Sequence, residues 1–145
     1  MIALGADHAG YEFKEKIKKL LQSLNMEFQD LGTHSTESSD YPDYAHSVAE
    51  AISSGKAEYG ILVCGTGIGM SIVANKHNGV RAAVVESVNA ARLAREHNDA
   101  NVLAVGARIT PWETAQEIIK TFLTTGFEGG RHQRRVDKIH TLTNL

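Results

Sequence analysis

Five short apolar segments alternate with segments of helical periodicity along this chain, and this alternation limits its possible folds more than any other feature. The apolar segments are residues 2–6, 27–32, 60–64, 80–85 and 101–106. Parallel strands need a long crossover connection, usually a helix, so this order is typical of βαβ units. We therefore expect an α/β fold: a Rossmann-like three-layer sandwich with a five-stranded parallel sheet, helices on both faces and a C-terminal helix.

The segments between the expected strands carry apolar stripes. In the first segment, apolar residues recur at intervals of three and four positions and so share one face of a helix whose other face is rich in Lys and Glu. These residues are Phe13, Ile17, Leu20, Leu21 and Leu24. Similar patterns predict helices around residues 44–52, 68–76 and 91–94. In the last segment Val136, Ile139 and Leu142 form a narrow apolar edge, which predicts the C-terminal helix.

Turn and cap residues add two boundaries. The sequence Thr-Pro-Trp-Glu at 110–113 places Thr110 as an N-cap, Pro111 at the first helical position and Glu113 three residues after the cap. This capping box predicts a helix that runs to Leu123. The polar residues 33–43 predict a surface loop between the second strand and the second helix.

Length and composition exclude several classes of function. The 145 residues fit a single domain covering 1–145. No apolar run approaches the roughly 18–20 residues that span a bilayer. The net charge of −2 provides no positive electrostatic field that would attract a nucleic acid. We expect neither a membrane nor a nucleic acid as partner. The N-terminus lacks a signal-peptide pattern and the only cysteine, Cys64, has no disulfide partner within the chain, which together predict a cytoplasmic location.

The stretch after the third expected strand, Cys-Gly-Thr-Gly-Ile-Gly at 64–69, is the most informative motif. Its glycines permit close approach of a ligand, and the helix that follows leaves backbone N–H groups without helical partners, so the loop can bind an anion. The glycine spacing does not fit a dinucleotide fingerprint, because Met70 or Ile72 stands where its third glycine belongs. A P-loop lysine is also lacking, and the loop is closer to an oxyanion cradle.

Cys64 permits two interpretations. A thiol near a helix N-terminus or cationic groups ionises readily and acts as a base or nucleophile. A lone cysteine at the end of a strand is also often a small buried apolar side chain. The sequence pattern leaves both open, although the glycine loop favours the first.

Other polar residues stand near the ends of the expected elements. In open parallel sheets ligands bind outside the carboxyl ends of the strands. Asp7 and His8 follow the first strand, Arg108 follows the fifth, and His97 and Asn98 end the fourth helix. We expect all of them to contribute to one edge of the sheet, together with the glycine loop.

The basic run at 131–135 is either a solvated helix face or a phosphate site. Arg131 and Arg135 are four residues apart, so they share a helix face and can form a fork for a phosphate dianion together with Arg108. Metal ligands are not predicted, because the chain has no H-x-x-x-H or C-x-x-C motif. The remaining histidines considered, which are expected to be structural or solvated, are His34, His46, His77 and His140.

Five segments, spread from the first strand to the last helix, together resemble the ribose-5-phosphate isomerase B family of sugar-phosphate isomerases, which also include galactose-6-phosphate isomerase. The segments are GADHAGYEFK, DYPDYA, CGTGIGMSIVANK, REHNDANVLAVGAR and EGGRHQRRV. The resemblance implies a five-stranded parallel α/β fold and a homodimer or homotetramer with its active site at the subunit interface. It implies no cofactor.

The same resemblance implies a role for each matching residue. Cys64 is expected to remove the proton from carbon 2 of an open-chain sugar phosphate, Thr66 to assist proton movement between oxygens, and His97 to open the sugar ring. The other residues are expected to bind substrate: the enediolate oxygen by the amides of Gly65, Gly67, Ile68 and Gly69, the sugar by Asp7, His8 and Asn98, and the phosphate by Arg108, Arg131 and Arg135. A second branch of the family has a glutamate where this chain has Met70, so this chain resembles the cysteine branch.

The activity implied is interconversion of ribose 5-phosphate and ribulose 5-phosphate through an enediolate. Two alternatives remain at this point. One is a hexose-6-phosphate isomerase of the allose or galactose type on the same scaffold. The other is a sugar-phosphate-binding module without catalysis, in which Cys64 would be idle.

Overall fold

All five strands lie in one sheet with the order β2-β1-β3-β5-β4. The computed structural model describes residues 1–145. The strands are β1 (Ile2–Ala6), β2 (Phe28–Asp30), β3 (Tyr59–Cys64), β4 (Ala82–Val84) and β5 (Val102–Gly106). Every neighbouring pair is parallel, and β3 lies at the centre between β1 and β5. The predicted five-stranded parallel sheet is confirmed.

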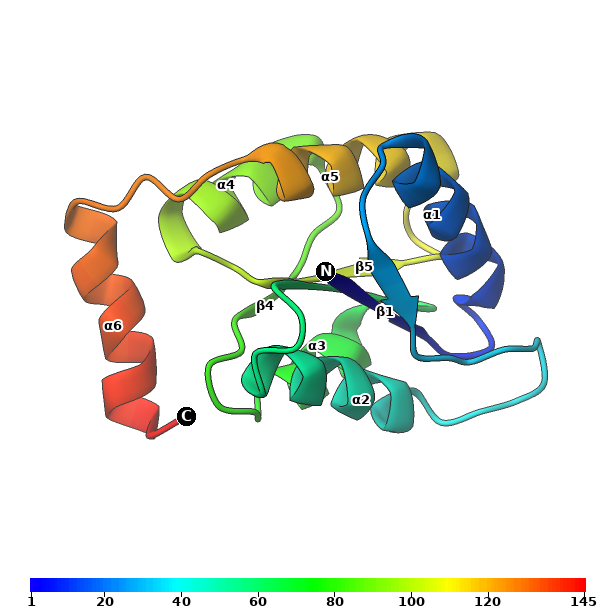
Figure 1. Cartoon of the computed structure of the whole chain (residues 1–145), viewed down its shortest axis with the longest axis horizontal. Helices are drawn as coiled ribbons and strands as arrows, with labels where there is room; N and C mark the ends of the chain where they lie inside the picture. The colour runs from blue at the N-terminus through cyan, green and yellow to red at the C-terminus, as the bar shows by residue number, and fades with distance from the viewer.

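Helices cover both faces of this sheet (Figure 1). One layer contains α1 (Tyr11–Ser23), α4 (Val88–Asn98) and α5 (Trp112–Thr124), and the other contains α2 (Tyr41–Ser53) and α3 (Ile68–Ala74). The last helix, α6 (Arg131–Thr143), lies outside both layers at the end of the molecule that carries β4. The arrangement is the predicted three-layer sandwich with an added C-terminal helix.

The alternation of side chains along the strands divides the core in two. Successive residues of a strand face opposite sides of its sheet. Leu103 and Val105 of β5 therefore pack with α1, α4 and α5, whereas Val102 and Ala104 pack with α2 and α3. Both sets are fully buried. The near-continuous apolar character of the central strands follows from this burial on two faces.

Two predicted helix boundaries are wrong. The capping box at Thr110 does not form: Pro111 is the N-cap, its backbone is extended (φ −60°, ψ 150°), and no side chain caps α5. Thr110 is instead buried in the preceding turn, where its N–H donates to the Gly106 carbonyl. The predicted loop at 33–43 ends early, because α2 begins at Tyr41 and accommodates Pro42 in its first turn.

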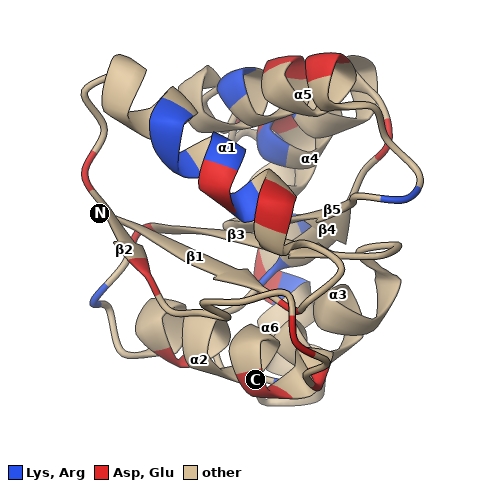
Figure 2. Ribbon diagram, turned by 90° about the vertical axis from the view of Figure 1, so that its right-hand side faces the viewer, with Lys and Arg blue, Asp and Glu red and all other residues tan.

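Charge is unevenly distributed between the two layers. Charged residues, mostly lysines, gather on α1 in the upper layer (Figure 2). The sequences of α2 and α3 contain no Lys or Arg. The helices do not include one long and apolar enough to cross a membrane.

Candidate active site

The loops after β1, β3 and β5 meet at the carboxyl edge of the sheet because these three strands are neighbours. The Asp7 N–H donates to the Val63 carbonyl (3.3 Å). The Ala107 N–H donates to the Cys64 carbonyl and the Arg108 N–H to the Gly65 carbonyl, both at 2.9 Å. The backbone thus fixes Asp7, Cys64 and Arg108 around one end of β3.

Cys64 is buried, and its sulfur also has a hydrogen-bond partner in the glycine loop. It is 5 % exposed and belongs to the core cluster beneath α2 and α3. Its Sγ also accepts a hydrogen bond from the Gly67 N–H at 3.1 Å. Gly67, the N-cap of α3, adopts φ +79°, a conformation that favours glycine. The glycine loop therefore folds back over the sulfur and holds it in one position.

The loop uses some of its own amides. The Ile68 N–H donates to Thr66 Oγ1 (3.2 Å), and the Gly67 N–H is directed to the sulfur. Of the four amides expected to hold an enediolate oxygen, these two therefore already have partners within the loop. An oxygen bound there has to share or replace these hydrogen bonds.

Asp7 and His8 shape the neighbouring loops. Asp7 is buried, and its Oδ1 accepts hydrogen bonds from the Ala9 N–H (3.0 Å) and the Gly10 N–H (3.1 Å). The Ser39 N–H donates to His8 Nδ1 at 3.1 Å, and the His8 N–H donates to Ser39 Oγ at the same distance. His8 Nδ1 also lies 3.2 Å from the Ser39 carbonyl oxygen, so both backbone groups of Ser39 contact this nitrogen. The β1 loop is thereby joined to the segment that precedes α2.

Arg108 brings positive charge to this edge. Its side chain lies over the glycine loop, since Nη1 is 2.9 Å from the position that a Cβ on Gly65 would occupy. Arg108 is otherwise exposed. A guanidinium in this place is available to an anionic ligand above the loop.

His97 and Asn98 do not lie at this edge, which corrects the expectation that all site residues meet there. They end α4, which returns from the carboxyl end of β4 to the amino end of β5. Only a short turn separates Asn98 from Val102, the first residue of β5. Cys64 instead pairs with Gly106, the last residue of β5. At about 3.3 Å per residue, the length of β5 alone separates the two edges by roughly 13 Å.

The surroundings of His97 tie α6 to α4. The rings of His97 and His132 stack, with centroids 4.3 Å apart and planes at 15°. The Glu128 carboxylate lies 3.8 Å from His97 Nε2 and 3.6 Å from His132 Nε2. The Glu128 N–H donates to the Glu96 carbonyl (3.1 Å). The helix α6, which carries Arg131 and Arg135, therefore begins beside the end of α4.

The predicted site residues thus form two groups. The carboxyl-edge group consists of Asp7, His8, Cys64, Gly65, Thr66, Gly67, Ile68, Gly69 and Arg108. The amino-edge group consists of His97, Asn98, Arg131 and Arg135. Each group contains arginine, but only the first contains the thiol. A single chain does not bring the two groups together.

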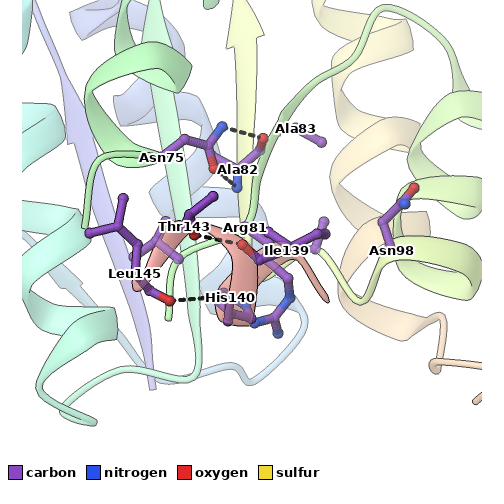
Figure 3. Close-up of a pocket in the computed structure, with 11 residues that line it drawn as sticks. Asn75, Arg81, Ala82, Ala83, Asn98, Ile139, His140, Thr143 and Leu145 are labelled. Carbon is purple, nitrogen blue, oxygen red and sulfur yellow. Dashed lines mark hydrogen bonds between the residues drawn. The ribbon is translucent and has the colours of Figure 1, made fainter. Parts of the chain in front are cut away.

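The largest cavity, about 410 Å³, lies at the amino edge between β4 and α6 (Figure 3). Of the predicted site residues only Asn98 lines it. The Arg81 guanidinium donates to His140 Nε2 (3.0 Å) and to the Asp99 carbonyl (2.9 Å) at its wall. Burial lowers the pKa of Arg81 from its ordinary value, although Asp99 acts in the opposite direction. The cavity is therefore close to the amino-edge group and remote from the thiol.

The sequence analysis missed two groups of potential metal ligands. The structure brings together His46, Glu50 and His77 in one place, and His97, Glu128 and His132 in another. Within each group the ligand atoms lie within 4.8 Å of one another. The spacing H-x-x-x-E at 46–50 was an available signal, because residues four apart share a helix face. Glu128 lies before α6, so the spacing of Glu128 and His132 gave no such signal.

The family of this chain follows from a comparison with known proteins. A model of the family described as Ribose/Galactose Isomerase matches residues 2–139. The chain belongs to the Ribose/Galactose Isomerase family.

Relatives in this isomerase family are similar to this chain along almost the whole length of both proteins. Ribose-5-phosphate isomerase B of Escherichia coli is 48 % identical over 138 residues, which cover 95 % of this chain and 93 % of that protein. D-erythrulose-4-phosphate isomerase of Pectobacterium atrosepticum is 47 % identical over 139 residues, covering 95 % of this chain and 91 % of that protein.

A solved structure extends the similarity to the fold. Ribose-5-phosphate isomerase B of Clostridium thermocellum has a TM-score of 0.97 and 48 % identity, and the match covers 99 % of this chain and 97 % of that one. Coverage of this extent includes α6. The unusual position of α6 outside the two helix layers is therefore shared with this member of the isomerase family.

Proposed function

We propose that this protein interconverts ribose 5-phosphate and ribulose 5-phosphate. The observation that carries the proposal is the Cys64 sulfur, held by the Gly67 amide at the carboxyl edge of the sheet, in a chain similar throughout to ribose-5-phosphate isomerase B. An aldose–ketose isomerase needs a base at carbon 2, an acid for ring opening and an anion site. The two groups of site residues supply these three functions.

In the proposed reaction the Cys64 thiolate takes the proton from carbon 2 of the open-chain aldose. The electron pair of that C–H bond forms the C1–C2 double bond of the enediolate, and the negative charge passes to the carbonyl oxygen. Thr66 relays a proton between the two oxygens, and the Cys64 thiol then returns its proton to carbon 1. The product is the ketose, and the thiolate is regenerated.

His97 is proposed to open the sugar ring before this step as an acid: its imidazolium donates a proton to the ring oxygen as the bond from carbon 1 to that oxygen breaks. The imidazole then takes the proton of the anomeric hydroxyl, whose oxygen becomes the carbonyl of the open-chain aldose, and the imidazolium is restored. Its imidazole is 39 % exposed, so a substrate can reach it. Asp7, His8 and Asn98 are assigned to the sugar hydroxyls. Guanidinium groups bind phosphate through paired N–H donors, and we assign this role to Arg108, Arg131 and Arg135.

The proposal requires two copies of the chain. A complete site consists of the carboxyl-edge group of one subunit and the amino-edge group of its partner. In a dimer with twofold symmetry this contact occurs twice and forms two identical sites. Exposed apolar side chains, including Ile72 (56 %) and Leu142 (80 %), supply surface for such an interface. We include a homodimer, or a tetramer built from it, in the proposal, together with a cytoplasmic location, which the free Cys64 thiol supports.

Substrates of other chain lengths are the alternative. The Pectobacterium relative is named for a four-carbon sugar phosphate and the family for both ribose and galactose. An assay must therefore compare sugar phosphates of four, five and six carbons.

The test is conversion of ribose 5-phosphate to ribulose 5-phosphate by the wild-type protein and by Cys64→Ala. We expect wild-type turnover to persist in EDTA and to fall by at least about a thousandfold in the variant, because proton abstraction loses its base. His34→Ala, an exposed histidine outside both groups, is the matched control and should retain activity. Full activity of Cys64→Ala contradicts the base assignment, and turnover of only four- or six-carbon substrates contradicts the substrate assignment.

A further inference from the structure

Three side chains outside both site groups converge on the outer surface of the lower helix layer. His46 and Glu50 lie one turn apart on α2, and His77 follows the end of α3. His46 Nδ1 is 2.8 Å from His77 Nε2, and Glu50 Oε1 is 3.9 Å from the same nitrogen. Two imidazoles and one carboxylate are a donor set that Zn²⁺ uses in proteins.

Backbone contacts prepare His77 for this role. Its Nδ1 lies 3.0 Å from the Val73 carbonyl and 3.3 Å from the Ala74 carbonyl. Both partners are acceptors, so Nδ1 carries the proton and Nε2 presents a lone pair toward His46 and Glu50. A metal-binding histidine commonly donates its second N–H to a carbonyl in this way, which fixes the tautomer and the ring orientation. His77 is also only 13 % exposed at its side chain, so its ring is held in place.

The distances are close to those of a tetrahedral site. Ligand atoms about 2.0–2.1 Å from a tetrahedral Zn²⁺ are roughly 3.3 Å from one another. The His46–His77 separation of 2.8 Å has to widen by about half an ångström, and the Glu50–His77 separation of 3.9 Å has to narrow by a similar amount. His46 and Glu50 are exposed and can make these adjustments by side-chain rotation.

Ring orientation distinguishes this group from the other histidine pair. Imidazole lone pairs lie in the ring plane. The planes of His46 and His77 are inclined at 46°, so they intersect and one ion can lie in both. The rings of His97 and His132 are stacked at 15°, and their planes meet only far from the nitrogens. The stacked pair is therefore poorly oriented to share an ion.

The electrostatic surroundings also favour a cation. No Lys or Arg occurs in α2 or α3, and Glu50 adds a negative charge; the nearest cation along the chain is Lys76, beside His77. We infer that His46, Glu50 and His77 form a binding site for a divalent cation of the zinc class, with the remaining coordination position open to water. The ion would join α2 to the end of α3, the helix that begins at the glycine loop.

The inference is tested by titrating the full-length protein with Zn²⁺ alone and measuring stoichiometry by equilibrium dialysis. We expect one tightly bound Zn²⁺ per chain and a metal-dependent rise in Tm. His46→Ala and His77→Ala should each weaken binding by roughly a hundredfold and Glu50→Gln by roughly tenfold. Because His46 and Glu50 are exposed, their variants keep the test valid even where His77→Ala fails to fold.

Three control variants separate this site from other ligands in the chain. His34→Ala removes an exposed histidine elsewhere, His132→Ala removes the stacked pair, and Cys64→Ser removes the only thiol. All three should bind Zn²⁺ as the wild type does. Absence of stoichiometric binding, binding unchanged by His46→Ala, or an equal loss in His132→Ala or Cys64→Ser overturns the inference. The proposed isomerase activity does not depend on this ion, so activity in EDTA tests that proposal separately.

Discussion

At the scale of single residues, the buried pair Lys14–Asp30 is the clearest feature that sequence patterns do not predict. Lys14 lies on the helix face that faces the sheet, and its side chain is only 1 % exposed. Its ammonium group donates to Asp30 Oδ2, and Lys18 donates to the same oxygen at 2.9 Å. The Gly32 N–H donates to Oδ1 at 2.9 Å. Asp30 therefore joins α1 to the end of β2.

These contacts set the charge state of Asp30. Burial by itself would raise the pKa of this carboxyl, but the hydrogen bonds from Lys14, Lys18 and the Gly32 amide outweigh burial and hold the pKa below its ordinary value. A carboxyl with a lowered pKa in the folded state stabilises the protein at all pH values above its unfolded-state pKa, about 3.9. This contribution is lost as the pH falls through the lower folded-state pKa.

Asp30→Asn should consequently destabilise the protein by about 2–4 kcal/mol at neutral pH, because it removes the carboxylate closest to the buried Lys14 charge and leaves only Glu15, whose Oε1 lies 3.5 Å from Lys14 Nζ. The difference in free energy of unfolding between wild type and variant should be constant between pH 7 and about 5 and shrink below about 3.9. Urea unfolding at several pH values measures this difference. Glu37→Gln, an exposed carboxyl on the following loop, should change stability little at any pH, and an equal effect of both variants would contradict the argument.

At the scale of secondary-structure elements, the end of β5 passes directly under the glycine loop. A Cβ on Gly106 would lie 2.6–2.7 Å from the backbone of Thr66. Backbone atoms cannot move aside as a flexible side chain does, so only glycine permits this contact. The close contact positions the turn that carries both Cys64 and the start of α3.

Gly106→Ala should therefore destabilise the protein by about 1–3 kcal/mol through overpacking and displace the loop above it. Gly126→Ala is the matched control, since a Cβ there has no neighbour within 4 Å. Thermal unfolding of both variants measures the effect, and turnover of ribose 5-phosphate should decline only for Gly106→Ala. Equal stability of the two variants would show that β5 and the loop can separate without cost.

The elements themselves were largely predictable, because strands and amphipathic helices leave local patterns in the sequence. All five strands occur where the apolar runs predicted them, and five of the six helices where the apolar stripes did. The exception is α5, which was predicted from a capping box that does not form. The helix boundaries at Thr110 and Tyr41 were not predicted correctly. Local cap motifs compete with turn contacts, such as the hydrogen bond that the Thr110 N–H donates to the Gly106 carbonyl. The glycine loop was recognised as a special turn, but the use of the Gly67 amide by Cys64 itself required coordinates.

At the scale of the whole molecule, the expectation that His97 and Cys64 lie at one edge of the sheet is wrong, although the predicted βαβ order already implies their separation. Both stand near the end of an element, but one element is a helix that runs against the direction of the strands and the other is a strand. Residues at the ends of successive strand and helix therefore lie at opposite edges of the sheet. The rule that residues at the carboxyl ends of parallel strands lie at one edge of the sheet therefore holds for Asp7, Cys64 and Arg108. It does not hold for His97 and Asn98, which end a helix.

The proposed shared site makes a prediction that concerns two chains at once. Cys64→Ala and His97→Ala should each be nearly inactive alone. In a heterodimer of the two variants, one site combines an intact carboxyl-edge group with an intact amino-edge group, while the other site contains both substitutions. Refolding the two variants together at equal amounts produces heterodimers as half of all dimers, so about a quarter of the wild-type activity should return.

The double variant Cys64→Ala/His97→Ala provides the control for this experiment. Mixed with Cys64→Ala, it cannot form a complete site in any dimer and should restore no activity. If each site were built from one chain, the first mixture would also remain inactive, because every chain in it carries a defect. Activity that returns only when the two substitutions are on different chains therefore requires that Cys64 and His97 act across the subunit interface, which is the arrangement proposed from their positions at opposite edges of the sheet.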